Sequence, residues 1–569
     1  MLFSWENNCV FGNFMKMRLV LYAILGFFAI FLFYPIIFIF LKAFFYNGRI
    51  SFSFFQYMFT NSVLRECITN SFFLAVVVTF FTAFLSLPLA FITTKFDFKA
   101  KAFFSGLLLL PMIMPPFVGA IGMRQMLARF GSINLLLMKI GLINQPLDFL
   151  AGGGFWAVVF MEVLHLYPLM FLNLSASMAN IDPSLEEQAQ NLGANGWKML
   201  KTITFPLLMP GLFAGASIVF IWSFTDLGTP LIFEYTRLVP VQIFNMVTDI
   251  GENPMGYALV VVVVLLTLIF FLFSKFLVGS KNYEMLSKGQ VAASSAKKLK
   301  GINGFLCYVF LVSMIFISLL PHLSVFLTSI SDNWFMSILP KTLTAKYYGM
   351  VFSHPLTVLS IKNSIFLSTV ATILDVILGL LIAYILARST LKEKSILDVV
   401  TMLPLAIPGL ILAFGYVACF SSGPLDVRNN PFPLLVIAYT IRRVPYVVRS
   451  VYAGFQQTSV AFEEASLNLG ASVSYTFLKI TSPLIAANII AGAILSFSFA
   501  MLEVSDSLIL AMKEQFYPIT KAIYVLVGRI SDGSYMASAL GVLGMLLLAF
   551  SLFFANKILG KKMGQIFRI

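Results

Sequence analysis

Two short segments carry the same pattern of acidic, small and glycine residues, and they are the most informative part of the sequence. Across residues 183–215 and 460–492, 12 of 33 aligned positions are identical. A loop that only lies on a membrane surface would not explain why these segments repeat better than most of the apolar stretches. The copies read Glu186-Glu187-Gln188-Ala189-Gln190-Asn191-Leu192-Gly193-Ala194, then eleven residues to Pro206, and Glu463-Glu464-Ala465-Ser466-Leu467-Asn468-Leu469-Gly470-Ala471, then eleven residues to Pro483.

The local sequence predicts a helix–turn–helix unit rather than a flexible connector. Asp182-Pro183 supplies an N-cap and a proline at the first helical position. A short amphipathic helix follows, and Gly193 then permits a left-handed or tight turn that other residues resist. A second short helix runs to Pro206. We call these units the first foot (183–205) and the second foot (460–482).

The rest of the chain is apolar enough to be solvated by lipid. Of its 569 residues, 59% are hydrophobic and only 11% are charged, whereas a soluble domain carries about 25% charged residues. The apolar runs are long and continuous rather than alternating, which favours helices over a barrel. The sequence therefore predicts an all-α, polytopic membrane protein.

Composition also excludes several functions. The net charge is +14, but the basic residues cluster in particular loops, which is typical of membrane orientation rather than of nucleic-acid binding. The four cysteines form no CxxC pair and there are only three histidines, so we expect neither a disulfide framework nor a metal site. No GxxxxGK[ST] phosphate loop occurs. The chain is thus expected to bind no cofactor itself, and any ATP would be hydrolysed by a separate chain.

Twelve segments have the roughly 20 apolar residues that a membrane helix needs. They form two sets of six, separated by a polar, basic stretch. This predicts a first half at 1–280, a cytoplasmic linker at 281–301 and a second half at 302–569. The segments lie near 18–45, 69–94, 102–128, 155–179, 206–233, 255–278, 302–329, 361–388, 396–420, 432–454, 483–511 and 536–557.

The distribution of basic residues predicts that both termini are cytoplasmic. Lysine and arginine gather before the first helix, after the second and the eighth, between the sixth and the seventh, and at the end of the chain, which places these loops on one side. Some basic residues in the outer loops oppose this assignment: Arg124, Arg129, Lys139, Lys341, Lys346 and Lys513.

The two halves repeat each other outside the feet as well. Asn70-Ser71 matches Asn363-Ser364 at an offset of 293, whereas the feet match at an offset of 277, so the second half is 16 residues shorter in one external loop. Six helices per half give parallel halves, related by an axis along the membrane normal. Prolines are expected to kink or break the third helix of each half, namely Pro111 and Pro115, and Pro404 and Pro408.

Charged residues inside the predicted membrane helices are candidates for the transport pathway, because such charges are costly and often functional. Asp375 lies midway along the eighth helix, Arg442 and Arg443 midway along the tenth, and Glu162 and His165 in the fourth. His165 is the repeat counterpart of Arg442. One hypothesis pairs Asp375 with an arginine. In another, the arginines line the pathway and attract an anion or a chelated metal. In the third, these residues only hold helices together.

Asp226 and its repeat counterpart Glu503 lie about 20 residues beyond the prolines of the feet. At 1.5 Å per residue this is about 30 Å, near the outer face. They could line an outer gate or sit at a wet helix end, and the sequence favours neither.

The feet resemble the EAA loop of binding-protein-dependent ABC importer permeases. In that family the loop is a coupling helix that docks into a groove on the ATPase subunit. The first copy departs from the family pattern at Gln188 and Asn195, and the second at Ser466, where alanine is usual. The resemblance implies contacts to an ATPase dimer at Glu187, Ala189, Gly193, Glu464, Ser466 and Gly470.

Softer motifs extend the resemblance to the fused two-half permeases of ferric-iron importers, among them Phe224-Thr225-Asp226-Leu227-Gly228-Thr229-Pro230 and Arg442-Arg443-Val444-Pro445. This implies a bacterial inner-membrane permease that receives ferric iron from an extracytoplasmic substrate-binding protein and works by alternating access. Related permeases carry aminoethylphosphonate, thiamine, sulfate or polyamines. An ion-coupled secondary transporter also uses internal repeats, but the paired feet argue against it.

Overall fold

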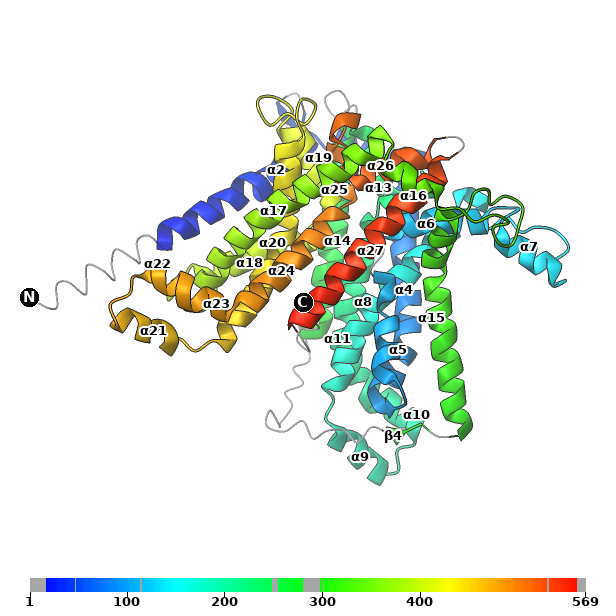
Figure 1. Cartoon of the computed structure of the whole chain (residues 1–569), viewed down its shortest axis with the longest axis horizontal. Coiled ribbons are helices and arrows are strands. Elements are labelled where there is room, and N and C mark those ends of the chain that lie inside the picture. The colour runs from blue at the N-terminus through cyan, green and yellow to red at the C-terminus, as the bar shows by residue number, and fades with distance from the viewer. Residues whose placement is uncertain are drawn as a thin grey trace, which may run out of the picture.

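The computed structural model describes residues 17–46, 48–112, 115–247, 254–279, 297–299, 301–529 and 532–559. The described chain is almost entirely helical (Figure 1), as the sequence predicts. Its few strands are two residues long, and one of them, β4 (Lys297–Lys298), pairs with β3 (Phe96–Asp97). Apart from residues 297–299 and Gly301, the expected linker lies outside the described residues.

Eight helices of the described chain are long and apolar enough to cross a membrane, and three bent pairs raise the number to eleven. The remaining predicted span coincides with α20 (Phe432–Gln457), which packs against α17 (Pro355–Arg388) and α24 (Ala486–Met501) but carries three arginines. The count of twelve therefore stays a prediction. The eight are Met17–Phe44, α4 (Ser62–Lys95), α8 (Phe155–Ala179), Gly196–Ile232, Met255–Phe273 in α14 (Met255–Gly279), α15 (Gly301–Ser329), α17, and Gly533–Ala555 in α27 (Gly533–Leu559).

The third helix of each repeat is broken, as its prolines predict. Lys101–Met112 and Pro116–Lys139 meet at 88°, and Lys394–Ala406 and Gly409–Cys419 meet at 99°. Pro115 and Pro408 stand at the N-caps of the outgoing helices. Pro115, which precedes Pro116, and Ile407, which precedes Pro408, are not helical, because a residue before proline avoids the helical conformation. The pieces are α5 (Lys101–Leu107), η2 (Leu110–Met112), α6 (Pro116–Leu127) and α7 (Ser132–Lys139), then α18 (Lys394–Ala406) and α19 (Gly409–Cys419).

The first helix of each repeat crosses to the other repeat. The helix Met17–Phe44, which ends in α2 (Tyr34–Phe44), packs against α19, and α15 packs against α6. Glycines at equivalent positions permit both approaches. A Cβ on Gly122 would lie 2.5 Å from the backbone nitrogen of Val325, and a Cβ on Gly415 would lie 2.9 Å from Cβ of Pro35. The repeats are thus interlocked.

The repeated Asn-Ser motif has the same structural role twice. The Asn70 amide donates to the Tyr235 hydroxyl at 2.9 Å, and Ser71 Oγ accepts from the backbone nitrogen of Val239 at 2.9 Å. Asn363 donates to the carbonyl of Gln515 at 3.0 Å, and Ser364 accepts from Ile519 at 2.8 Å. The motif therefore anchors the start of a short helix in each repeat, namely α13 (Val239–Met246) and α26 (Ile519–Val527).

The axis that relates the repeats passes between these two short helices. Phe244 of α13 and Tyr524 of α26 are repeat counterparts, and their rings meet edge to face with centroids 6.3 Å apart. Equivalent residues can touch each other only near a twofold axis. In Figure 1, α13 and α26 lie at one end of the molecule, and the helices of both feet lie at the other.

Candidate functional site

The first foot has the helix–turn–helix structure that its sequence predicts. Asp182 caps α9 (Pro183–Asn191) by accepting from the Ser184 nitrogen at 2.9 Å. Gly193 then takes the left-handed conformation with φ +80°. Asn195 caps α10 (Gly196–Met199) in the same way. The second foot repeats this structure with α21 (Ala461–Asn468), Gly470 at φ +88° and α22 (Val473–Thr476).

The second helix of the first foot does not end at Pro206, as the sequence led us to expect. It continues through a π-helical turn, η4 (Leu200–Thr204), into α11 (Phe205–Thr225), so that the helix runs without interruption from Gly196 to Thr225. A helix tolerates proline where the proline's missing N–H is not needed for a backbone hydrogen bond. In the π-helical turn just before Pro206, the backbone hydrogen bonds span five residues instead of four, so the regular pattern is interrupted there. In the second foot, η5 (Phe477–Thr481) has the same place, but a bend of 75° follows Leu484.

The turn of each foot presents an exposed leucine at its tip. Leu192 is 88% exposed and its counterpart Leu469 is 89% exposed. The two leucines occupy equivalent positions, each directly before the glycine of its foot. Next to Leu469, a hollow of about 670 Å³ opens between the helices of the second foot, lined by Phe462, Ala465, Ser466, Leu469, Gly470, Ala471, Ser472, Tyr475 and Ile480.

The residues predicted to contact an ATPase divide into two groups. Glu187, Gly193, Glu464 and Gly470 are exposed. Ala189 is buried, and the half-buried Ser466 hydroxyl shares a hydrogen bond of 2.9 Å with Thr476 of the second helix. These two positions hold the helices of the foot together, so they support the contact surface from within.

Sequence reasoning passed over the first glutamate of each foot. Glu186 forms an ion pair with Lys95 at the end of α4, and Glu463 forms one with Arg388 at the end of α17. A signal was present in the sequence. Both glutamates are identical in the repeat, and Lys95 and Arg388 are equivalent basic residues at the offset of 293.

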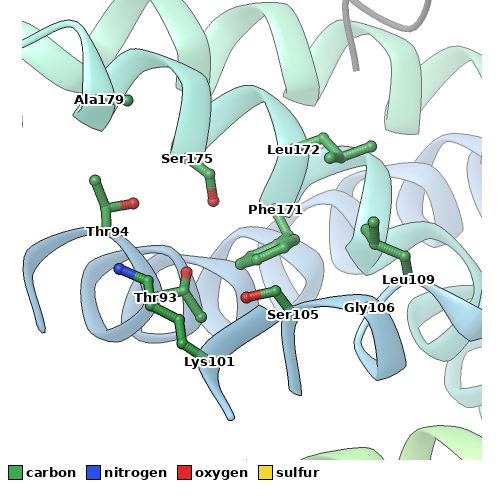
Figure 2. A pocket seen from close by; sticks show the side chains of 10 residues that line it. All are labelled: Thr93, Thr94, Lys101, Ser105, Gly106, Leu109, Phe171, Leu172, Ser175 and Ala179. Carbon is green, nitrogen blue, oxygen red and sulfur yellow. The ribbon is translucent and has the colours of Figure 1, made fainter. Parts of the chain in front are cut away.

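An open hollow with a mainly apolar lining lies near the first foot. It has a volume of about 450 Å³, opens to the outside, and is lined by residues of α4, α5 and α8 together with Leu109 (Figure 2). The counterparts of its Ser105 and Leu172 are Asp398 and Arg449, which form an ion pair of 3.4 Å. At these two positions the first repeat therefore has a serine and a leucine beside the hollow, where the second repeat has a salt bridge. The polar lining consists of Thr93, Thr94, Lys101, Ser105 and Ser175.

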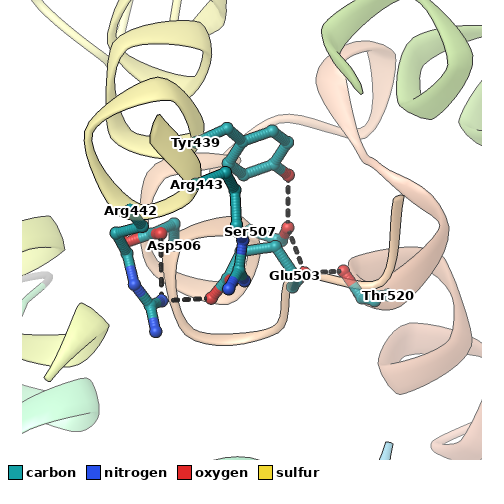
Figure 3. Close-up of polar contacts among 7 residues, drawn as sticks. All are labelled: Tyr439, Arg442, Arg443, Glu503, Asp506, Ser507 and Thr520. Atoms are coloured by element: carbon teal, nitrogen blue, oxygen red, sulfur yellow. Dashed lines mark hydrogen bonds and ion pairs between the residues drawn. The ribbon is translucent and has the colours of Figure 1, made fainter. Parts of the chain in front are cut away.

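A cluster of charged side chains lies between α20 and the segment after α24 (Figure 3). Arg442 forms ion pairs with Glu503 Oε1 at 2.5 Å and with Asp506 Oδ2 at 3.3 Å, and Arg443 forms one with Glu503 Oε2. Thr520 donates a hydrogen bond of 2.6 Å to the Glu503 carbonyl. Two cations and two carboxylates thus neutralise each other in a largely buried site, as buried charges require.

Asp375 does not pair with either arginine, which corrects one of the hypotheses above. Its Oδ2 accepts a hydrogen bond from Ser496, and the described structure places no basic group within ion-pair distance of it. The arginines are instead engaged by Glu503 and Asp506. The sequence indicated which residues are polar but not how the helices are rotated against each other.

In the first repeat, the residues equivalent to Arg442 and Glu503 form hydrogen bonds with the backbone instead of ion pairs. His165 Nδ1 lies 3.0 Å from the carbonyl oxygen of Pro111, at the break of the third helix. Its counterpart Arg442 packs on Gly409, also at a break. Asp226, the counterpart of Glu503, accepts from the backbone nitrogens of Gly228 at 3.3 Å and Thr229 at 3.1 Å.

Asp226 therefore binds two backbone nitrogens at the start of α12 (Gly228–Ile232), whereas Glu503 binds two arginines. Glu162 accepts a hydrogen bond from Ser223 in the same region. Among the described residues, no group of three or more histidine, cysteine, aspartate or glutamate side chains is arranged to hold a metal ion.

The sequence profile of the family described as "Binding-protein-dependent transport system inner membrane component" matches residues 85–281 and 375–565. The chain belongs to this family, and it is a multi-pass permease component of an ABC-type transport system in the inner membrane. The two matched ranges contain the first and the second foot, respectively. The predicted resemblance to importer permeases is thereby confirmed.

Relatives with established names match most of the chain or one repeat. The ferric transport system permease protein FbpB of Actinobacillus pleuropneumoniae is 28% identical over 504 residues, which cover 86% of this chain and 70% of that one. The Fe(3+)-transport system permease protein FbpB 2 of Haemophilus influenzae is 24% identical, covering 79% and 82%. The molybdate/tungstate permease protein WtpB of Methanocaldococcus jannaschii is 34% identical over 209 residues, covering 36% and 82%.

Proposed function

We propose that this chain is the membrane-spanning permease of an ATP-driven importer of ferric iron. Two relatives named for ferric transport match it over 86% and 79% of its length. In this proposal, residues 1–280 and 302–569 form two six-helix halves joined by the linker 281–301, and both termini are cytoplasmic. The substrate arrives on an external binding protein, and the chain itself performs no covalent chemistry.

The observation that carries the mechanism is the pair of feet at one end of the molecule (Figure 1). Two feet suit two subunits of an ATPase dimer, which would bind the ATP. Leu192 and Leu469 would enter a groove on each subunit, and Glu187 and Glu464 would contact its rim. Closure of the dimer on ATP would then move the feet together and change the side to which the pathway opens. The binding protein would dock at the opposite end, near α13 and α26.

The cluster of Arg442, Arg443, Glu503 and Asp506 is the candidate for the part of the pathway that rearranges during transport. Arg442 packs on Gly409 at the break before α19, and its side chain keeps 20% exposure. Broken helices near the midplane provide pathway surfaces in other transporters. Separation of Arg442 from Glu503 or Asp506 would expose charge to a passing ion. Asp375, His165 and Asp226 would be supporting residues in this proposal.

Uptake by proteoliposomes tests the proposal. The chain is reconstituted with a candidate ATPase and a candidate binding protein from the same organism, and radiolabelled ferric iron is offered with and without ATP. The expected result is ATP-dependent accumulation of iron that needs the binding protein. Uptake that is driven by an ion gradient and needs no ATPase would contradict the proposal and indicate a secondary transporter.

An oxyanion is the second candidate substrate. It is favoured by the similarity to the molybdate/tungstate permease protein and by the two adjacent arginines in the buried cluster. Molybdate and sulfate are therefore included in the same assay. ATP-dependent uptake of either one, with no uptake of iron, would replace ferric iron as the substrate and leave the importer mechanism in place.

A further inference from the structure

Each foot is joined to the second membrane helix of its own repeat by an ion pair between equivalent residues. Lys95 Nζ lies 2.6 Å from Glu186 Oε2, and Arg388 Nε lies 3.1 Å from Glu463 Oε1. Both pairs thus connect the end of a long helix, α4 or α17, to the first helical turn of a foot. We call them the first latch (Lys95–Glu186) and the second latch (Arg388–Glu463).

The latches are sheltered from solvent. The side chains are 17% and 15% exposed in the first latch, and 9% and 11% exposed in the second. Partly buried ion pairs are screened by salt much less than exposed pairs. Thr204 donates to Glu186 Oε1 at 3.2 Å, so the same carboxylate also binds the π-helical turn of its foot.

The second latch has additional contacts. Arg388 also donates a hydrogen bond of 3.0 Å to the carbonyl of Thr458, and its guanidinium lies 5.3 Å from the ring centroid of Phe455. Arginine has several donors in a fixed plane, whereas lysine is a single point charge. Arg388 therefore also binds the end of α20 (Phe432–Gln457), directly before the second foot.

The neighbouring glutamates behave differently. Glu187 and Glu464 are exposed and take part in no ion pair within the described structure. Of the two consecutive glutamates in each foot, the first is thus turned inward onto the helix bundle and the second is turned toward the outside of the protein. The repeat preserves this division of roles in both copies.

We propose that Glu186 and Glu463 are positioning residues that transmit the displacement of the feet to α4 and α17. Each foot is covalently continuous with the fourth and fifth helices of its repeat, but it reaches the second helix only through noncovalent contacts, and the latch lies at that junction. The inference rests on the proposed docking of the feet on an ATPase. It assigns the latch residues to the coupling of ATP hydrolysis to transport, and not to ATPase binding.

Reconstitution of the complete importer tests the latches. The variants are Glu186→Gln, Glu463→Gln and the double variant, and the matched controls are Glu187→Gln and Glu464→Gln, each one residue away. Three quantities are measured: ATPase binding, ATP hydrolysis and substrate uptake. We expect the double latch variant to bind the ATPase and hydrolyse ATP, but to take up roughly tenfold less substrate per ATP, within the usual range of coupling between sites.

Charge exchange separates coupling from folding. The double change Lys95→Glu with Glu186→Lys should restore part of the uptake lost in Lys95→Glu alone. Arg388→Lys should keep coupling, because the first latch already works with lysine. The controls Glu187→Gln and Glu464→Gln are expected to weaken ATPase binding, because these exposed glutamates lie on the proposed contact surface. The proposal is overturned if the latch variants weaken ATPase binding to the same extent, or if their uptake per ATP is unchanged. If the native chain binds no ATPase, the proposed function itself fails, and that outcome is visible before any variant is compared.

Discussion

At the scale of single residues, the two repeats keep the same positions but use different chemistry at them. His165 and Arg442 both contact the break in a third helix, yet one is an imidazole and the other a charged guanidinium. The sequence identified these positions, because charges within apolar segments stand out. The sequence could not identify their partners. A rotation of α20 about its own axis by one residue, about 100°, would turn Arg442 and Arg443 toward different neighbours.

The charged cluster gives a prediction with an internal control. Glu503→Gln leaves Arg443 and Arg442 without their shared carboxylate, and removal of one partner of a buried ion pair costs about 3–5 kcal/mol. The equivalent change Asp226→Asn should cost less than about 1 kcal/mol, because the amide oxygen of asparagine can also accept hydrogen bonds from the two backbone nitrogens that Asp226 binds. Thermal unfolding of the purified chains in detergent measures both. Equal losses of stability in the two variants would show that the ion pairs of Glu503 do not stabilise the cluster.

At the scale of elements, hydropathy and proline spacing predict most of the architecture. The membrane helices, the broken third helices and the two feet all follow from local sequence, because each depends on residues that are close along the chain. The continuity of the first foot with α11 was missed, since it depends on a π-helical turn that no residue type announces. The crossing of the first helices between repeats was also missed, because it is a long-range contact.

The two crossing glycines provide a prediction at this scale. Gly122→Ala and Gly415→Ala place a methyl group against Val325 and Pro35, respectively, and overpacking of this kind typically costs about 1–3 kcal/mol. Gly26→Ala is the control, because a Cβ there meets nothing within 4 Å. Lower thermal stability of the first two variants, but not of the control, is expected. Unchanged stability in all three would contradict the close crossing.

At the scale of the whole molecule, the internal repeat explains why one chain presents two similar feet on one side. The axis passes between Phe244 and Tyr524, and a rotation about it carries one foot onto the other without changing the end of the molecule at which it lies. The helix Met17–Phe44 begins, and α27 ends, on the side of the feet (Figure 1). The expected cytoplasmic location of both termini would place the feet where an ATPase can reach them.

Binding of the ATPase to the feet is the central claim, and a pull-down tests it most directly. The native chain is compared with the double variant Gly193→Asp, Gly470→Asp, in which aspartate replaces two exposed glycines with φ of +80° and +88°. Correct membrane insertion of both proteins is checked first. We predict that the native chain retains the ATPase and the double variant does not. A correctly folded native chain that binds no ATPase, or a double variant that binds as well as the native chain, would contradict the account.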